Sequence, residues 1–310
     1  MTKKVSIVIP AYNESSNIPV IAERIDTVFK NLNYSYEIIF VNDGSSDQTQ
    51  AFLEELNRAN SKVNFIELSR NFGHQSALKA GLDMANGDCV ISMDCDMQHP
   101  PEMIAEFLQK WEEGYEVVYT LRKESKDLSK FKRSTSNLFY SIINSISDIQ
   151  IDPGSADFRL LDRKVVNIFI NLSENEPFIR GLIKWLGFKQ FAITYEPSKR
   201  FSGQSQYTFK KMVRFALQGL TSFSIRPLYT AIYLGFIFSL LSLLYIPYVI
   251  QAFLRHQEVA GWASVIMTIV FFGGLQLIIL GIIGIYIGKL FMQSKQRPNY
   301  IISNTSIKKA

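Results

Sequence analysis

Short apolar runs alternate with longer amphipathic stretches over the first two-thirds of the chain. The apolar runs are rich in Val and Ile, and they lie at residues 5–9, 37–41, 63–68, 89–93 and 117–120. Between the first two runs, Ile21, Ile25 and Phe29 recur at helical spacing, which is typical of a helix that packs one face on a core. This alternation predicts an α/β fold with a mostly parallel, Rossmann-like sheet and helices on both of its faces.

The last third of the chain has a different pattern. Residues 228–254 and 259–288 contain no Asp, Glu, Lys or Arg, and each run exceeds the roughly 20 apolar residues that cross a bilayer. A pair of buried core helices is the alternative, but two such runs separated by a short break are more typical of a membrane hairpin. We therefore expect two transmembrane helices.

The segment before the first span is amphipathic. From residue 208 to 224 the apolar positions share one helical face, with Lys210, Lys211 and Arg214 opposite or beside it. This pattern predicts an interfacial helix, although an ordinary core-facing helix has the same pattern. We divide the chain into an N-terminal α/β domain, an amphipathic juxtamembrane helix, a two-helix transmembrane hairpin and a cytoplasmic tail, at residues 1–207, 208–226, 227–291 and 292–310.

Basic residues indicate the orientation in the membrane. They flank both ends of the paired spans, whereas the short connection between the spans offers only Arg255. By the positive-inside rule, both termini face the cytoplasm and the loop 255–258 faces outward. The residues before Pro10 lack the apolar core of a secretory signal. We expect a multi-pass protein of the inner (plasma) membrane with a cytoplasmic N-terminal domain.

Charge and cysteine content exclude other classes of protein. The formal net charge is +5, but much of the basic excess lies beside the spans, as expected near anionic lipid. No nucleic-acid-binding motif is visible, so we expect no nucleic-acid partner. Cys89 and Cys95 complete no zinc pattern, and cytoplasmic thiols are kept reduced, so we expect small core or near-site residues rather than a disulfide.

Polar loops follow three of the apolar runs, at residues 10–14, 42–47 and 94–100. Open α/β sheets bind ligands at the carboxyl ends of their strands, so we expect these acidic loops to converge on one edge. No Gly-x-Gly-x-x-Gly follows the first run, which disfavours a nucleotide-dependent oxidoreductase.

Asp94 and Asp96 are the strongest candidates for chemistry. Alternate residues at the end of a strand point the same way, so these two carboxylates can hold one cation. Mg²⁺ or Mn²⁺ bound there would suit a nucleotide diphosphate, because the metal neutralises the charge that builds on the departing diphosphate. The alternative is a solvated turn. Asp43 and Glu14 follow other strands and are predicted to contact the nucleotide, with a turn or a helix cap as the alternative for each.

Six ordered segments carry a family resemblance that covers nearly the whole chain. They are residues 9–14 (IPAYNE), 41–47 (VNDGSSD), 69–78 (SRNFGHQSAL), 94–102 (DCDMQHPPE), 157–163 (DFRLLDR) and 200–207 (RFSGQSQY). Together they resemble inverting family 2 glycosyltransferases of the polyisoprenyl-phosphate branch, with the bactoprenol glucosyltransferase group nearest and the dolichol-phosphate mannose synthases further off. One departure is Cys95, where Ala is commoner in this family.

The resemblance implies a GT-A catalytic domain at residues 1–207, a nucleotide-sugar donor and a lipid phosphate acceptor. The donor-binding residues that it implies are Pro10, Ala11, Tyr12, Glu14, Asp43, Asp94 and Gln98, together with Ser202 and Ser205 of a flexible loop. Asp96 joins Asp94 at the metal and counts among the catalytic residues.

The acceptor needs a cationic cradle, because a lipid phosphate is already anionic and requires little help from a general base. Arginine presents a planar fork that suits phosphate, and the resemblance places Arg122, Arg133 and Arg200 around the site. A solvated surface position is the alternative for each of them. Asp157 resembles a residue proposed as catalytic base in relatives, and orienting a sugar hydroxyl or an arginine is the equal alternative.

These observations predict metal-dependent, inverting single displacement that moves a hexose onto undecaprenyl or another polyisoprenyl phosphate. The segment SRNFGHQSAL resembles that of the bacterial UDP-sugar group, and this resemblance favours UDP-glucose as donor. A mannose synthase that uses GDP-mannose, or a transferase of another UDP-sugar of the amino-arabinose or GlcNAc type, is the alternative. A processive polysaccharide synthase lacks its Gln-x-x-Arg-Trp segment here, and a lipid flippase has no intramembrane charge to work with. The spacing Gly284-x-x-x-Gly288 points weakly to a homo-oligomer.

Overall fold

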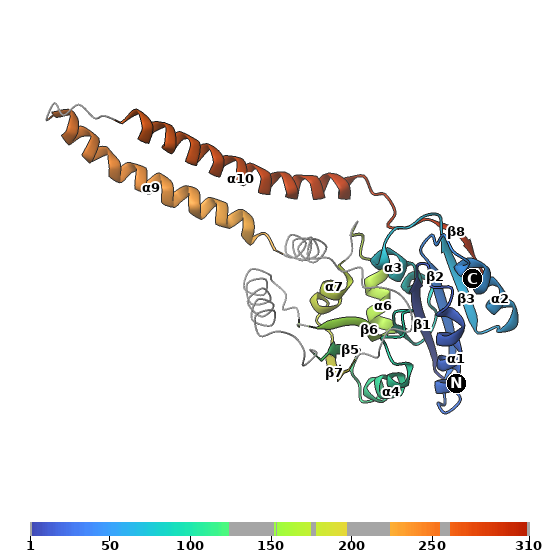
Figure 1. Cartoon of the computed structure of the whole chain (residues 1–310). Coiled ribbons are helices and arrows are strands. Elements are labelled where there is room, and N and C mark those ends of the chain that lie inside the picture. The colour runs from blue at the N-terminus through green and yellow to red at the C-terminus, as the bar shows by residue number, and fades with distance from the viewer. Residues whose placement is uncertain are drawn as a thin grey trace.

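The computed structural model describes residues 2–123, 152, 154–174, 178–196, 224–254 and 261–308. Figure 1 shows an α/β domain from which two long helices project together. The predicted interfacial helix lies outside the described residues from 208 to 223, as does the predicted outward loop 255–258.

An eight-stranded sheet forms the centre of the α/β domain, in the order β7-β5-β6-β4-β1-β2-β3-β8. Its strands are β1 Lys4–Ala11, β2 Ser35–Asn42, β3 Val63–Leu68, β4 Cys89–Ser92, β5 Val117–Arg122, β6 Ser155–Asp162, β7 Gln190–Tyr195 and β8 Ile302–Thr305. The five apolar runs identified in the sequence form β1 to β5, as predicted. The strands β6, β7 and β8 were not predicted.

The sheet is mixed. Neighbouring strands pair in parallel at β1–β2, β1–β4, β2–β3 and β5–β7. The strands β6 and β8 run against their neighbours. The prediction of parallel pairing is therefore right for β1 to β5 and β7. It is wrong for β6, which lies between β4 and β5, and for β8, which pairs with β3.

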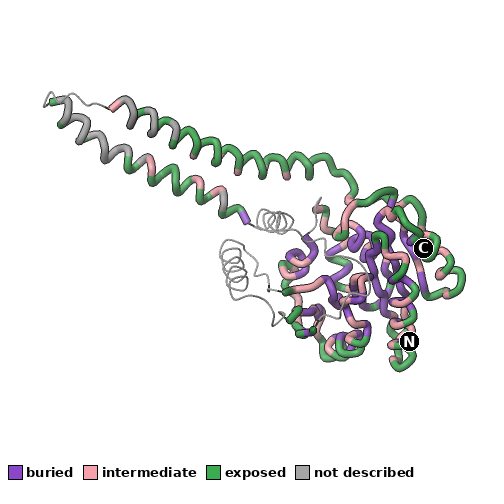
Figure 2. Tube along the Cα trace, in the orientation of Figure 1, coloured by how far each residue is buried: buried purple, intermediate pink, exposed green. Residues whose placement is uncertain are grey.

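Helices cover both faces of the sheet, as the alternating pattern predicted. One face carries α1 Ile18–Phe29, α2 Thr49–Ala59, the short 3₁₀ helix η1 Pro101–Met103 and α4 Ile104–Glu112. The other face carries α3 His74–Met84, α6 Arg163–Ile170 and α7 Ile179–Trp185. In Figure 2 the buried part of the chain is concentrated along the strands and on the helix faces turned toward them.

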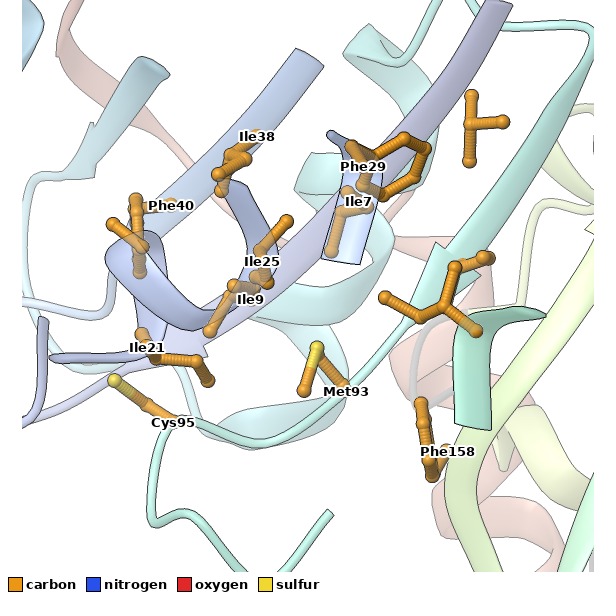
Figure 3. Close-up of a cluster of buried hydrophobic side chains, with 14 of the residues drawn as sticks. Ile7, Ile9, Ile21, Ile25, Phe29, Ile38, Phe40, Met93, Cys95 and Phe158 are labelled. Carbon is orange, nitrogen blue, oxygen red and sulfur yellow. The ribbon is translucent and has the colours of Figure 1, made fainter. Parts of the chain in front are cut away.

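The core under α1 shows why these residues fold together. Ile21 and Ile25 of α1 and Ile7 and Ile9 of β1 are fully buried, and Figure 3 shows them packed with Cys95 near the end of β4. Complete burial of such a side chain stabilises the fold by roughly 1.5 to 3 kcal/mol. The core therefore fixes the ends of β1 and β4 beside each other.

Two long helices follow the α/β domain, α9 Arg226–Leu254 and α10 Trp262–Ser294. Among the described residues, Phe271–Ser294 is the one stretch long and apolar enough to cross a membrane, and Leu228–Phe238 is a shorter apolar stretch. Leu277 and Leu290 of α10 are largely exposed. One membrane-spanning candidate is thus present, and the prediction of a second one in α9 is not confirmed.

The chain returns to the α/β domain after α10. The strand β8 pairs antiparallel with β3, and Tyr300 donates a hydrogen bond of 2.7 Å from its hydroxyl to Asp83 of α3. Asn299 donates to the carbonyl of Glu174 at 2.8 Å. The segment 292–310, predicted as a tail, therefore contributes a strand to the sheet.

Candidate active site

The loops after β1 and β2 lie against each other at one edge of the sheet. The backbone N–H of Asn13 donates to Ser45 Oγ at 2.9 Å, and the backbone N–H of Ser46 donates to Asn13 Oδ1 at 2.9 Å. Asn13 adopts a positive φ of 56°. Because β4 pairs directly with β1, the loop after β4 lies at the same edge. The predicted convergence of the acidic loops is therefore confirmed.

The predicted donor residues of the first loop offer different groups to a ligand. Pro10 and Ala11 are the last residues of β1 and are buried, so their backbone rather than their side chains defines the edge. Tyr12 is exposed. The carboxylate of Glu14 accepts a hydrogen bond from Asn17 Nδ2, and its carbonyl accepts from the Asn17 N–H. Glu14 thus stabilises the turn before α1, and its contact with a nucleotide stays a prediction.

Asp43 is buried at the end of β2 and holds the segment before α3. Its Oδ1 accepts from the Phe72 N–H at 2.7 Å, and its Oδ2 accepts from the Gly73 N–H at 2.9 Å. Burial raises the pKa of Asp43 above its ordinary value, although these two amides oppose the rise. Asp43 therefore fixes the loop that carries His74, and a nucleotide contact remains a prediction for it.

Asp94 and Asp96 follow β4 in a tight turn. The Asp94 N–H donates to His99 Nδ1 at 2.9 Å, and Asp96 Oδ1 accepts from the Gln98 N–H at 3.1 Å. Met97, which follows Asp96, has a positive φ of 64°. Asp94 Oδ1 is buried and accepts no hydrogen bond within the part of the chain that the structure describes.

This carboxylate oxygen fits a cation. A buried polar oxygen without a hydrogen bond is costly unless a ligand or ion satisfies it. No group of three or more His, Cys, Asp or Glu side chains that could hold a metal exists among the described residues, so ligand oxygens would have to complete the coordination of Asp94 and Asp96. Cys95 is buried in the apolar core, as expected for a side chain that points away from the metal.

Asp157 lies inside a cluster of donors on β6. Arg180 of α7 donates from Nε to Oδ1 at 2.7 Å and from Nη2 to Oδ2 at 2.8 Å. Gln75 Nε2 and Arg159 Nη2 donate at 3.3 Å and 3.4 Å. Burial would raise the pKa of Asp157, but the charge of Arg180 and the hydrogen bonds of His74 and Arg180 hold it well below its ordinary value. This geometry favours the orienting role and disfavours a general base.

His74 lies between the two carboxylates. Its Nε2 is 3.5 Å from Asp94 Oδ1 and 3.4 Å from Asp157 Oδ2. Burial opposes the charged ring, but the contact with Asp157 and the charge of Asp94 outweigh it and raise the pKa of His74 to about 9. The site therefore contains an imidazole that the sequence analysis did not identify.

The predicted acceptor cradle is described in part. Arg122 at the end of β5 donates from Nη1 to Gln98 Oε1 at 3.4 Å, which brings it beside the Asp94–Asp96 turn. Arg133, Arg200, Ser202 and Ser205 lie outside the described residues. Their roles stay predictions.

Sequence reasoning missed His74, Gln75, His99 and Arg180. The first three lie within the segments that carry the family resemblance, so their position was marked but their contacts were not. Arg180 gave no signal, because it belongs to an ordinary-looking helix and reaches Asp157 across 23 positions of the chain.

Comparisons with known proteins identify the family of this chain. Residues 6–169 match the model of the family described as glycosyl transferase family 2. The chain is 43% identical to an uncharacterized glycosyltransferase of Synechocystis over 98% of this chain and 96% of that protein. It is 37% identical to the bactoprenol glucosyl transferase of Shigella phage SfV over 97% and 98% of the two chains.

A solved structure shows a more distant likeness. A mannosyltransferase from Pyrobaculum calidifontis in complex with GDP-Man and Mn²⁺ is 16% identical, with a TM-score of 0.46, and the match covers 72% of this chain and 64% of that one. The family model, by contrast, spans more than half of the chain, and relatives that match over nearly their full length are 43% and 37% identical to it. The chain therefore belongs to glycosyl transferase family 2 and is a glycosyltransferase.

Proposed function

We propose that this glycosyltransferase transfers glucose from UDP-glucose to a polyisoprenyl phosphate at the cytoplasmic face of the membrane, with inversion and with a bound divalent metal. The observation that carries the proposal is the buried Asp94 Oδ1 without a hydrogen bond, beside Asp96 at the carboxyl end of β4. The relatives named bactoprenol glucosyl transferases, which match over nearly their full length, support the sugar and the lipid.

Asp94 and Asp96 would hold Mg²⁺ or Mn²⁺ together with oxygens of the donor diphosphate. The metal would supply charge neutralisation for the departing diphosphate. Two carboxylates are enough for this purpose, because hard divalent cations in nucleotide sites commonly take their remaining ligands from phosphate and water.

The transfer itself is a single displacement. An oxygen of the lipid phosphate attacks the anomeric carbon, the new carbon–oxygen bond forms as the bond to UDP breaks, and the electron pair leaves with the diphosphate. The acceptor phosphate is already anionic, so no proton has to be removed. Asp157 is then free of a base's role and holds Arg180 in place through two charge-assisted hydrogen bonds.

The remaining predicted residues divide between donor and acceptor. Tyr12, Glu14 and Asp43 line the nucleotide side of the edge, with the backbone of Pro10 and Ala11, and Gln98 lies beside the metal. We propose that Arg122, Arg133 and Arg200 bind the acceptor phosphate, together with Ser202 and Ser205. Selection of UDP over GDP rests on pocket shape, since a site shaped for a pyrimidine clashes with a purine.

The apolar helix α10 supports attachment to the membrane, where a polyisoprenyl phosphate resides. We propose that α9 crosses the membrane as well, which keeps the α/β domain and the C-terminal strand on one side. A homo-oligomer is a further proposal. A Cβ added at Gly284 or Gly288 of α10 meets no atom of the described chain nearby, so another helix has room to approach.

A transfer assay tests the proposed function. Membranes that contain the full-length protein and a polyisoprenyl phosphate are incubated with Mn²⁺ and radioactive UDP-glucose, and label is counted in butanol-extractable lipid. We expect lipid label from UDP-glucose, and none from the double variant Asp94→Asn and Asp96→Asn. Efficient labelling from GDP-mannose or UDP-GlcNAc instead would overturn the donor, and label confined to water-soluble products would overturn the acceptor.

A further inference from the structure

The carboxylate of Asp94 lies between two imidazole rings. His74 Nε2 is 3.5 Å from Oδ1, and His99 Nε2 is 3.6 Å from Oδ2. The chain has three histidines, so two of the three face this carboxylate. Such an arrangement around one candidate metal ligand indicates that the orientation of Asp94 is set by its neighbours.

His99 approaches Asp94 from the core. It is buried, and its ring stacks on Phe158 with centroids 5.0 Å apart and an interplanar angle of 13°. His99 Nδ1 accepts a hydrogen bond from the Asp94 N–H, so Nδ1 carries no proton and the ring proton of the neutral imidazole is on Nε2. The Nε2 atom lies 3.6 Å from Asp94 Oδ2. His99 therefore holds the backbone of Asp94 by a hydrogen bond and lies beside one of its side-chain oxygens.

His74 faces the other oxygen of the Asp94 carboxylate. It is the first residue of α3, and its side chain is 42% exposed. The same nitrogen that faces Asp94 Oδ1 lies 3.4 Å from Asp157 Oδ2. Asp157 is itself fixed by Arg180. His74 therefore connects the firmly held carboxylate of Asp157 to the carboxylate of Asp94, which has an oxygen available for a ligand.

We propose that His74 and His99 are positioning residues that orient the Asp94 carboxylate toward a divalent cation, and that His74 also joins Asp94 to the Asp157–Arg180 pair. The cation part of this inference rests on the proposed function. A carboxylate oxygen has two lone pairs, so Oδ1 can face an imidazole N–H and bind a cation at the same time. Outer partners of this kind fix ligand orientation, and their loss typically weakens metal binding about 10- to 100-fold.

The first test measures binding of Mn²⁺ to the full-length protein in detergent with saturating UDP present, by electron paramagnetic resonance, because the diphosphate supplies the oxygens that complete the coordination. We expect His74→Ala to weaken Mn²⁺ binding about tenfold, because Asp94 loses its partner. His74→Gln should restore most of the affinity, since its amide N–H can replace the imidazole N–H. Ser76→Ala changes another residue of the same helical turn and should leave the affinity unchanged. Equal affinity of His74→Ala and the unmodified protein would overturn the inference.

The second test needs no metal. Unfolding is measured by chemical denaturation for His74→Ala, Asp157→Asn and the double variant. A direct contact predicts that the two effects are coupled by a factor of about three or more in the unfolding equilibrium constant. Simple additivity would overturn the connection between His74 and Asp157.

The two tests separate this inference from the proposed function. If the unmodified protein binds no Mn²⁺, the metal-dependent function fails and the cation part of the inference fails with it, while the unfolding cycle still decides the contact with Asp157. If the unmodified protein binds Mn²⁺ and His74→Ala binds it equally well, the inference fails alone and the proposed function stands.

Discussion

Asp94 and Asp157 differ sharply although both face His74. The side chain of Asp94 is 36% exposed, and one of its oxygens accepts no hydrogen bond from the described residues. The side chain of Asp157 is 5% exposed, and both of its oxygens accept from Arg180. A carboxylate with an unsatisfied oxygen is available to a ligand, whereas a carboxylate surrounded by donors is a structural anchor.

The contrast follows from the strands that carry them. Asp94 follows β4, at the carboxyl end of the central strands. Asp157 lies within β6, where it pairs with Arg180 of α7. A charge buried in the sheet is stable only when it is paired with opposite charges and hydrogen bonds. A charge at the end of a strand is partly solvated and remains available to a ligand. The comparison therefore predicts a loss of catalysis for one residue and a loss of stability for the other.

The largest effect is expected at Asp94. Asp94→Asn should lower the rate of sugar transfer by about 100-fold or more, because the charge on the leaving diphosphate is no longer balanced. Its thermal unfolding should stay close to that of the unmodified protein, since no hydrogen bond from the described residues reaches Oδ1. Activity measured across a Mn²⁺ titration checks the first part, and activity that persists in chelator would contradict it.

Asp157→Asn should act on stability. Its loss removes the ion pairs that Asp157 makes with Arg159, which is 3% exposed, and with Arg180. Removing one member of a buried ion pair costs about 3 kcal/mol or more. Chemical denaturation of the detergent-solubilised protein measures this loss. A variant of normal stability that has lost only its activity would instead restore the catalytic-base role.

The same residue predicts a pH dependence. The pKa of Asp157 is held well below its ordinary value in the folded chain, and it returns to about 3.9 in an unfolded chain. The stability that Asp157 contributes is therefore complete above its unfolded pKa and is lost as the pH falls toward the folded pKa. Asp157→Asn should remove this component, so its unfolding free energy should depend less on pH below about 4.

The comparison also explains what the sequence could predict. The strands β1 to β5 were predictable because each contains a run rich in apolar residues, and Asp94 and Asp96 were visible because acidic residues follow such a run. The strand β6 escaped because Asp157 and Arg159 interrupt its apolar pattern. Burial of Asp157 and Arg159 is stabilised by Arg180 of α7. No pattern within β6 predicts that long-range contact.

The strand β8 escaped for another reason. Ile302–Thr305 is a four-residue strand with Asn, Ser and Thr among its residues, and such a segment has no apolar alternation to recognise. Its position depends on β3, which precedes it by more than 200 residues in the chain. Long-range pairing of this kind makes the sheet mixed. The sequence pattern predicted only the parallel strands that are joined by local helical crossovers.

Arg122 extends the comparison to the acceptor side. Arg122→Ala should raise the acceptor concentration needed for half-maximal rate about tenfold, because a charge-assisted contact with phosphate is lost. Its effect on stability should be within about 0.5 kcal/mol, since the residue is exposed. Lys123→Ala is the matched control, because Lys123 pairs with Glu196 at the surface. An equal effect of both variants on the acceptor requirement would remove Arg122 from the cradle.

The smallest effect is expected at Gln75, which connects Asp157 to the first residue of α7. Gln75 donates to Asp157 Oδ2 at 3.3 Å and accepts from the Ile179 N–H at 3.2 Å. Gln75→Leu should destabilise the protein by about 1 kcal/mol, because it removes two long hydrogen bonds that each contribute about 0.5 kcal/mol. Gln109→Leu on the exposed face of α4 is the control and should change stability by less than about 0.5 kcal/mol. Because Asp157 keeps Arg180 in Gln75→Leu, a loss as large as that of Asp157→Asn would show that the start of α7, rather than the ion pair, holds this part of the site together.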